Sequence, residues 1–184
     1  MIKIIAGNNK GLVLKTPVGQ HTRPTLSRIR ESLFNILGHQ LSGRFLDLYA
    51  GSGSVGFEAF SRGCDHVTFI ENENQAIKVL ESNKAKFKDM GHSLHIIKGD
   101  ALAGIGLFSP KVKFDYIFLD PPYDQAYFDS WANRAVLSQQ MHETSKLIVQ
   151  HGKKNELSQQ WATLTRFDCR TYGETKLSFY KKQL

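Results

Sequence analysis

Residues 45–56 have the sequence FLDLYAGSGSVG, and this stretch decides the fold of the chain. Its first residues, Phe45 to Leu48, predict a short buried strand, and an apolar segment with helical spacing follows the glycine turn. A strand, a glycine turn and a helix form a unit in which the backbone can approach a ligand closely. The spacing of Gly51, Gly53 and Gly56 also fits the dinucleotide-binding fingerprint.

A carboxylate lies about twenty residues beyond the glycine turn, as in nucleotide-binding units of this kind. Glu71 ends the apolar run Val67–Ile70, and an acid at this place can accept hydrogen bonds from both ribose hydroxyls of a nucleoside. The first half of the chain therefore predicts a nucleoside-binding α/β unit. Two other interpretations stay open at this point: the dinucleotide-binding unit of a dehydrogenase, and a tight strand–helix turn that holds no ligand.

The composition is that of an ordinary globular protein. The chain has 184 residues, of which 41% are apolar and 22% are charged, so it is long enough for one domain with a full core. We find no apolar run that predicts a signal peptide or a membrane span, and the cysteines and histidines show no metal-ligand spacing. We therefore expect a cytoplasmic, monomeric protein that binds no metal and no membrane.

The net charge of +7 is concentrated near the N-terminus. Residues 1–30 contain six of the 24 basic side chains and none of the 17 acidic ones. The six cations are Lys3, Lys10, Lys15, Arg23, Arg28 and Arg30. A segment of one charge sign beside a nucleoside site favours a polyanionic partner, although a solvated basic arm is the alternative. Lys84, Lys86 and Lys88 predict a solvated helix face or an accessory contact with the same partner.

The segment before the glycine turn predicts a small hairpin and a helix. Two short apolar stretches up to Lys15 predict the hairpin, and an apolar stripe predicts a helix that begins near Arg23 and ends at Gly38. We therefore divide the chain into a basic N-terminal extension with its linker, residues 1–22, and a main domain, residues 23–184.

Strand and helix signals alternate after the first helix. The predicted strands cover residues 44–48, 66–71, 94–98, 114–119 and 146–151, and the predicted helices cover residues 54–62, 74–90 and 126–138. This alternation predicts an α/β fold with a mostly parallel sheet and helices on both faces. The tail differs, because residues 163–170 and 175–181 predict an antiparallel hairpin that closes one edge of the sheet.

The carboxyl ends of the strands in such a sheet converge on one site, because ligands bind there at the switch point of the strand order. These ends are residues 47–53, 71–72, 100–101 and 120–123. The last has the sequence Asp-Pro-Pro-Tyr, whose two prolines restrict φ and remove backbone donors. An acid, carbonyls without local partners and an aromatic ring suit a planar base with an exocyclic amine. The alternative is a loop whose aspartate caps a helix.

Several motifs together resemble one enzyme family. Asp-Pro-Pro-Tyr resembles the tetrad of amino-methyltransferases that use S-adenosylmethionine, and residues 47–53 resemble their cofactor motif. Further motifs are Ile4-Ile-Ala-Gly7, Arg23-Pro-Thr25, Arg28-x-Arg30-Glu31-x-Leu33-Phe34-Asn35 and Glu58-Ala-x-Ser-Arg-Gly63. Over nearly the whole chain, from about Lys3 to Lys181, the sequence is similar to the RsmD-type 16S ribosomal RNA guanine-N2 methyltransferases.

The resemblance implies a Rossmann-like class I methyltransferase fold with a seven-stranded sheet. It also implies S-adenosyl-L-methionine as cofactor, S-adenosyl-L-homocysteine as product, and the 16S ribosomal RNA or the small ribosomal subunit, including an assembly intermediate, as partner. The six N-terminal cations are then candidate RNA-binding residues. The candidate cofactor-binding residues are Asp47, Tyr49, Ala50, Gly51, Ser52, Gly53, Glu71, Asn72, Asp100 and Ala101. The candidate catalytic residues are Asp120, Pro121, Pro122 and Tyr123.

The cofactor residues divide by the part of the ligand that each is expected to hold. Glu71 is expected to accept hydrogen bonds from the ribose hydroxyls, and Asp100 from the adenine amino group. Asp47 is expected to accept from the amino group of the methionine moiety. Gly51 and Gly53 are expected to let the backbone approach that moiety.

The tetrad is expected to hold the substrate base. Hydrogen bonds from a guanine N2 amine to Asp120 and to the Pro121 carbonyl stabilise the charge that develops on the nitrogen as the methyl group arrives, and Tyr123 stacks on the base. Two alternatives stay open. An adenine-N6 methyltransferase of DNA or RNA shares the tetrad, although such enzymes usually carry a separate target-recognition domain. The other alternative is a non-catalytic RNA-binding module. Such a module would have no need for the tetrad together with Glu71 and Asp100, which argues against it.

Overall fold

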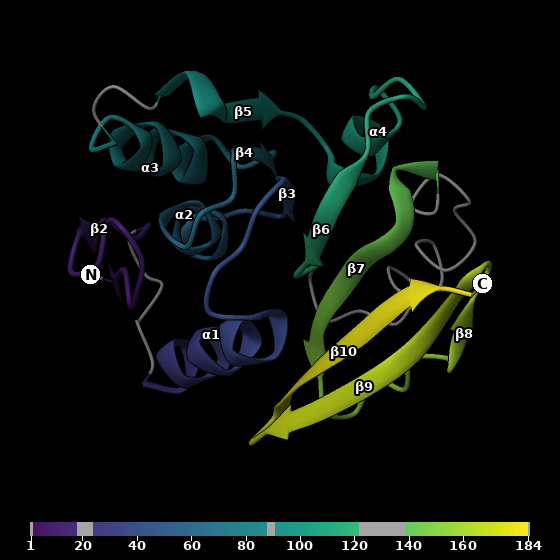
Figure 1. The fold of residues 1–184 in the computed structure, drawn as a ribbon. Coiled ribbons are helices and arrows are strands. Elements are labelled where there is room, and N and C mark those ends of the chain that lie inside the picture. Colours follow the sequence, from purple (N-terminus) through teal and green to yellow (C-terminus); the bar gives the residue numbers. More distant parts are fainter. Residues whose placement is uncertain (1, 18–23, 88–90, 122–138, 184) are drawn as a thin grey trace.

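The computed structural model describes residues 2–17, 24–87, 91–121 and 139–183 (Figure 1). These residues form one large sheet with helices on both faces, and a small two-stranded hairpin near the N-terminus. The predicted α/β class, with a mainly parallel sheet and an antiparallel C-terminal hairpin, is confirmed.

The large sheet has eight strands in the order β5-β4-β3-β6-β7-β10-β9-β8. In chain order they are β3 (Arg44–Leu48), β4 (His66–Glu71), β5 (Leu94–Lys98), β6 (Phe114–Leu119), β7 (Met141–Gly152), β8 (Gln160–Trp161), β9 (Leu164–Tyr172) and β10 (Thr175–Lys182). The strands from β5 to β7 are parallel, and those from β7 to β8 along the sheet are antiparallel. Seven strands are the predicted ones, and β8 adds a two-residue edge strand that the sequence did not predict.

The strand order reverses beside β3. The strand β4 lies on one side of β3 and β6 on the other, so the carboxyl ends of β3 and β6 border the crevice where ligands bind in open α/β sheets. Leu48 of β3 pairs with Ile70 of β4 and with Leu119 of β6. These three strands therefore end at the same level, and the residues that follow them meet at one edge of the sheet.

The helices differ from the prediction mainly in length. They are α1 (Pro24–Leu37), α2 (Ser54–Ser61), α3 (Asn74–Lys84), α4 (Ala101–Ile105) and the single 3₁₀ turn η1 (Gly91–Ser93). The helix α3 ends before the predicted residue 90, and the short α4 was not predicted. The helix predicted over residues 126–138 lies outside the described residues. Within the described parts of the chain, no helix combines the length and the apolar character that a membrane span requires.

Alternate residues of the strands face two hydrophobic cores, as the period of two requires. Phe45 and Phe69 pack with α1, α2, α3 and the N-terminal hairpin on one face of the sheet. Leu46 and Ile70 pack with α4 on the other face. Asp47 follows Leu46 in β3, so its side chain points to the face that α1 to α3 cover.

The N-terminal hairpin belongs to the first of these cores. Its strands β1 (Ile2–Lys3) and β2 (Val13–Leu14) pair antiparallel, with Ile2 opposite Leu14. Ile4 and Leu14 are buried among the residues of α1 and α2. The predicted hairpin is therefore present and docked on the main domain, while the predicted domain boundary between residues 22 and 23 lies outside the described residues.

A buried carboxylate joins the hairpin to α2. Glu58 has no exposed surface, and its oxygens accept hydrogen bonds from the backbone N–H groups of Ile5 at 2.8 Å and Ala6 at 3.0 Å. The Nε of Arg62 donates to the same carboxylate at 2.9 Å, and the Nε of Arg30 lies 3.6 Å from it. The buried charge is thus both paired and hydrogen-bonded, as charges in protein interiors need to be.

Candidate active site

The turn after β3 presents its backbone to a cavity at the carboxyl edge of the sheet. Tyr49 and Gly51 have φ angles of 60° and 56°, a conformation that costs glycine little. A Cβ atom built on Gly51 would meet nothing within 4 Å. The position of Gly51 therefore leaves open space directly against the backbone, and the approach of a ligand to this backbone stays a prediction.

Gly53 serves the hydrophobic core instead. It adopts φ 75° immediately before α2, and a Cβ atom at this position would lie 2.6 Å from Cε2 of Phe57 and would also overlap Leu80. The space beside Gly53 is filled by these two side chains. A side chain at position 53 would therefore enter the core rather than the cavity, and the expected approach of the Gly53 backbone to the methionine moiety stays a prediction.

Asp47 binds the first turn of α2 through a hydrogen bond. Its Oδ2 accepts a hydrogen bond of 2.9 Å from the backbone N–H of Gly56, and the side chain is almost fully buried. Burial raises the pKa of Asp47 well above its usual range, and the negative charges of Asp120 and Glu71 raise it further, against the Gly56 hydrogen bond. Asp47 therefore interacts electrostatically with Glu71 and Asp120 at the ends of β3, β4 and β6.

Glu71 is held rigidly at the end of β4. Its Oε2 accepts from the backbone N–H of Gly51 at 2.7 Å, and its Oε1 accepts from those of Asn72 and Glu73 at 2.9 Å each. An ionised carboxylate has about four acceptor sites, so roughly one remains for a ligand. The carboxylate is therefore preorganised beside the glycine turn.

Asp120 follows β6 and faces the same cavity. Asp120 is half-buried at the wall of the cavity, and burial raises the pKa of its carboxyl to about 7. A hydrogen bond with the Gln150 side chain opposes the rise. Gln150 was not predicted. The one signal for it is a polar residue after the apolar run Leu147–Val149 at the carboxyl end of a strand.

A cavity of about 300 Å³ joins these groups. Of the predicted cofactor and catalytic residues, its wall includes Tyr49, Ala50, Gly51, Ser52, Glu71 and Asp120. Ile29 and Leu33 of α1, with Phe118 of β6 and Gln150 of β7, add walls that the sequence analysis did not assign. The structure thus brings the ends of β3, β4 and β6 together under α1.

Five predicted cofactor residues, Asn72 among them, stand outside the wall of this cavity. Asp100 is exposed and caps α4, because its Oδ1 accepts from the backbone N–H of Ala103 at 2.9 Å. Ala101 is buried in the second core, and Gly53 and Asp47 face the protein interior. The expected contacts of Asp100 with adenine and of Asp47 with an amino group stay predictions.

The remaining site predictions fall partly beyond the described residues. Pro121 is buried, while Pro122, Tyr123 and Arg23 lie outside the described residues. Asn72 is exposed, and its backbone N–H supports Glu71.

Most of the predicted N-terminal RNA contacts lie on the surface. Lys3, Lys10, Lys15 and Arg28 are exposed. Among the lysines Lys84, Lys86 and Lys88, Lys86 donates from Nζ to the backbone carbonyl of Val13 at 2.6 Å, so it fastens the hairpin to the segment that follows α3.

Arg30 departs from the prediction. Only 4% of its surface is exposed, its Nη2 donates to the backbone carbonyl of Lys3 at 2.6 Å, and its guanidinium approaches Glu58. Burial lowers the pKa of Arg30, while Glu58 opposes that shift. Arg30 therefore forms part of the cavity wall and the hairpin anchor, and it is not a free cation for a phosphate on the surface.

Asn83 of α3 is a second anchor that the sequence analysis missed. Its Oδ1 accepts from the backbone N–H of Lys15 at 2.8 Å, and its Nδ2 donates to the carbonyls of Lys15 and Ser52 at 3.0 Å each. One fully buried amide thus connects the end of the hairpin to the glycine turn. An asparagine on a predicted helix face gave no sign of this role.

Comparisons with known proteins agree with the geometry. A Bacillus subtilis protein named "Putative rRNA methyltransferase YlbH" is 33% identical over 184 residues, which cover 99% of this chain and 100% of that protein. The "Ribosomal RNA small subunit methyltransferase D" of Haemophilus influenzae is 35% identical over 66% of this chain and 64% of its own length. The solved structure titled "Putative methyltransferase yhhF from Escherichia coli" is 26% identical, with a TM-score of 0.82 over 99% of this chain and 98% of that chain.

The doubly wound sheet, with its glycine turn and its carboxylates at the switch point, defines a class I methyltransferase fold. The model of the family described as "Conserved hypothetical protein 95" matches residues 2–181. The chain belongs to this family, and its predicted RsmD-type resemblance is confirmed.

Proposed function

We propose that this protein transfers a methyl group from S-adenosylmethionine to the exocyclic N2 amine of a guanine in 16S ribosomal RNA. The observation that carries the proposal is the group of carboxylates at the switch point. Asp47, Glu71 and Asp120 lie at the carboxyl ends of three adjacent parallel strands, and the charges of Glu71 and Asp120 raise the pKa of Asp47 beyond the rise that burial causes. Such a group favours a cationic ligand, and S-adenosylmethionine carries a sulfonium and an ammonium group.

The cavity residues fit this cofactor. Glu71 keeps about one acceptor site for a ribose hydroxyl after its three backbone hydrogen bonds. Gly51 leaves open space against the backbone, and Ile29 and Leu33 supply apolar walls. When bound, the cofactor supplies a methyl group that its sulfonium activates.

Asp120 acts on the substrate. Its carboxylate accepts a hydrogen bond from the guanine amine, which places the nitrogen and stabilises the positive charge that develops on it. Asp120 then takes the proton that this nitrogen releases, and a pKa of about 7 suits a base that works near neutral pH. Gln150 holds the carboxylate in place through its hydrogen bond. The Pro121 carbonyl and the Tyr123 ring stay predicted partners of the base.

The names of the relatives support ribosomal RNA as the substrate class, because the Haemophilus influenzae relative is named for the RNA of the small ribosomal subunit. We therefore include 16S ribosomal RNA, or the small subunit that contains it, in the proposal, and we propose that the enzyme acts as a monomer. The guanine N2 position rests on the resemblance to the RsmD-type enzymes, because adenine-N6 methyltransferases share the Asp-Pro-Pro-Tyr tetrad.

The decisive experiment is transfer of labelled methyl from S-adenosylmethionine to total RNA, genomic DNA and small ribosomal subunits, followed by nucleoside analysis. N2-methylguanosine in 16S ribosomal RNA is the expected product, and N6-methyladenine in any of the three would replace the proposal with the adenine alternative. Asp120→Asn should lower the single-turnover rate by roughly 10²-fold or more. The matched control is Asp65→Asn, which changes an exposed aspartate just before the amino end of β4.

A further inference from the structure

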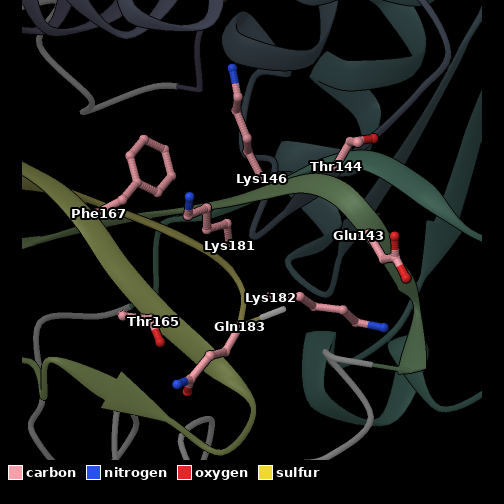
Figure 2. A pocket seen from close by; sticks show the side chains of 8 residues that line it. All are labelled: Glu143, Thr144, Lys146, Thr165, Phe167, Lys181, Lys182 and Gln183. Carbon is pink, nitrogen blue, oxygen red and sulfur yellow. The ribbon is translucent and has the colours of Figure 1, made fainter.

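A second pocket lies on the C-terminal strands, away from the candidate active site. It has a volume of about 620 Å³, and β7, β9 and β10 supply most of its lining (Figure 2). Figure 2 shows the ring of Phe167 beside Lys181 and near Lys146, each from a different strand. None of these residues belongs to the cavity of the glycine turn.

The aromatic ring is exposed because the strand is irregular at this point. In the pairing of β9 with β10, Phe179 is opposite Asp168 and Tyr180 is opposite Arg166, so Phe167 is the extra residue of a β-bulge. Bulges of this kind redirect a side chain. Phe167 is 43% exposed, and its ring stands 6.1 Å from that of Phe179 at a tilt of 51°.

Lysines lie on one side of this ring (Figure 2). Lys146 and Lys181 make no ion pair with any described residue, and Lys182 adds a third ammonium group to the lining. Glu143 is the one carboxylate in the described lining. The described lining therefore carries a net positive charge and one exposed aromatic face.

The pocket lies on the same face of the sheet as the candidate active site. Lys146 and Gln150 are four positions apart on β7, and side chains an even number of positions apart share a face. At about 3.3 Å per residue they are separated by about 13 Å, which corresponds to about four steps of a stacked strand at 3.4 Å per step. Ile148, which lies between them on this face, is buried in the first core, so an RNA whose base enters the cavity reaches the pocket by passing over the side chains that cover Ile148.

We propose that this pocket is an RNA-contact surface, in which a base of a single-stranded segment of the substrate stacks on Phe167 and its flanking phosphates lie against Lys146 and Lys181. This inference rests on the proposed function. Aromatic faces bordered by cations are how proteins bind single strands. The central part of a protein–protein interface is instead depleted in lysine, so the charge favours RNA over a ribosomal protein as the occupant.

The test uses the full-length protein and a fluorescent single-stranded fragment of 16S ribosomal RNA. Phe167→Ala should weaken RNA binding by roughly 5- to 150-fold, the scale for loss of one base–aromatic stack. Leu107→Ala is the matched control, because Leu107 is the other large apolar side chain exposed among the described residues. The affinity for S-adenosylmethionine should not change in either variant.

The lysines are tested through salt dependence. Lys146→Gln with Lys181→Gln should make the slope of log K against log salt shallower by about 1.4, at about 0.7 for each lost contact with a single strand. Lys78→Gln with Lys111→Gln, two exposed lysines elsewhere, should leave the slope unchanged. Photocrosslinking from a 4-thiouridine in the fragment should label the peptide that contains Phe167.

The outcomes separate this inference from the proposed function. If the wild-type protein methylates and binds 16S ribosomal RNA while the Phe167 and lysine variants bind it equally well, the RNA surface is overturned and the function stands. If the variants bind the RNA fragment normally but lose binding to intact subunits, the pocket docks a protein, and the RNA proposal is again overturned. Absence of methyl transfer by the wild-type protein to any RNA counts against the function itself.

Discussion

The backbone N–H of Gly51 donates a hydrogen bond of 2.7 Å to the Glu71 carboxylate, so the turn after β3 and the end of β4 share one polar group. The same carboxylate also accepts from the two backbone N–H groups that follow it. The turn that faces the cavity and the acid proposed to hold the ribose are therefore joined in one unit, and a substitution in either should alter the other.

Glu71→Ala should weaken S-adenosylmethionine binding by roughly 1–3 kcal/mol, the scale of a lost hydrogen bond to a charged group. Glu71→Gln is the informative companion, because its amide replaces one acceptor oxygen by a donor that faces backbone N–H groups. We expect it to bind no better than the alanine variant. Isothermal titration calorimetry measures both, and wild-type affinity in both variants would remove Glu71 from the cofactor site.

Substitutions of Gly51 and Gly53 by valine should impair different properties of the protein. Gly51→Val places its side chain in open space, at a cost of about 1–2 kcal/mol for the left-handed backbone, and it should fold but lose cofactor binding. Gly53→Val overlaps Phe57 and Leu80 in the core, so its main loss should be stability. Urea unfolding and calorimetry on both variants separate the two effects. A well-folded Gly51→Val that binds the cofactor normally would place the ligand elsewhere.

The pKa of Asp120 makes a prediction about stability. This pKa is about 7 in the folded chain and about 3.9 in the unfolded chain. Between these values the folded state holds the additional proton, so Asp120 lowers stability as the pH rises from about 4 to about 7. Asp120→Asn should remove this loss. Its free energy of unfolding should exceed that of the wild type at pH 8 by an amount on the order of 1–4 kcal/mol.

Urea unfolding of Asp120→Asn and of the wild type at pH 5 and pH 8 checks this expectation. The difference between the two proteins should grow with pH. A difference that is constant over this range would mean that Asp120 titrates near its ordinary pKa and lacks the base strength that the mechanism needs.

Local patterns predicted the parts of the site that are local in sequence. The glycine turn follows directly from a strand and a helix, and Glu71 ends the next strand, so register and spacing were enough to find them. Asp120 was found in the same way. The burial of Arg30 was missed because it depends on Glu58, a residue of another helix that the fold brings against it.

The anchors of the site were missed for a related reason. Asn83 binds Lys15 and Ser52, which are 68 and 31 positions away in the chain, and no periodic pattern records such contacts. Gln150 gave a weak signal as a polar residue after an apolar run, but its partner is on a different strand. The edge strand β8 has two residues, which is too short for an alternating pattern.

Glu58→Gln tests whether the hairpin is part of the folded core. The glutamine loses its charge beside Arg62 and turns an amide toward the backbone N–H of Ile5 or Ala6, so a buried cation is left without its partner. We expect a loss of about 3–5 kcal/mol. Glu81→Gln on the exposed face of α3 should be nearly neutral. Chemical unfolding of the wild type and of both variants measures these differences. A Glu58→Gln variant as stable as the wild type would mean that the hairpin docks independently of Glu58.

The last prediction concerns the contribution of the exposed N-terminal lysines to RNA binding. Deleting the segment is a poor test, because Ile4 and Leu14 are buried in the core. Replacing Lys3, Lys10 and Lys15 together by Gln changes only exposed cations. Cofactor affinity should stay the same, while RNA affinity should fall because phosphate contacts contribute most of the salt-dependent binding energy.

The slope of log K against log salt measures how many of these three contacts exist. It should become shallower by about 2 in the triple variant, at about 0.7 for each contact with a single strand. The exposed pair Lys78 and Lys111, replaced by Gln, provides the control for a general change in charge. An unchanged slope in the triple variant would show that the hairpin lysines are solvated, and the RNA would then be held by Arg28 or by the pocket around Phe167.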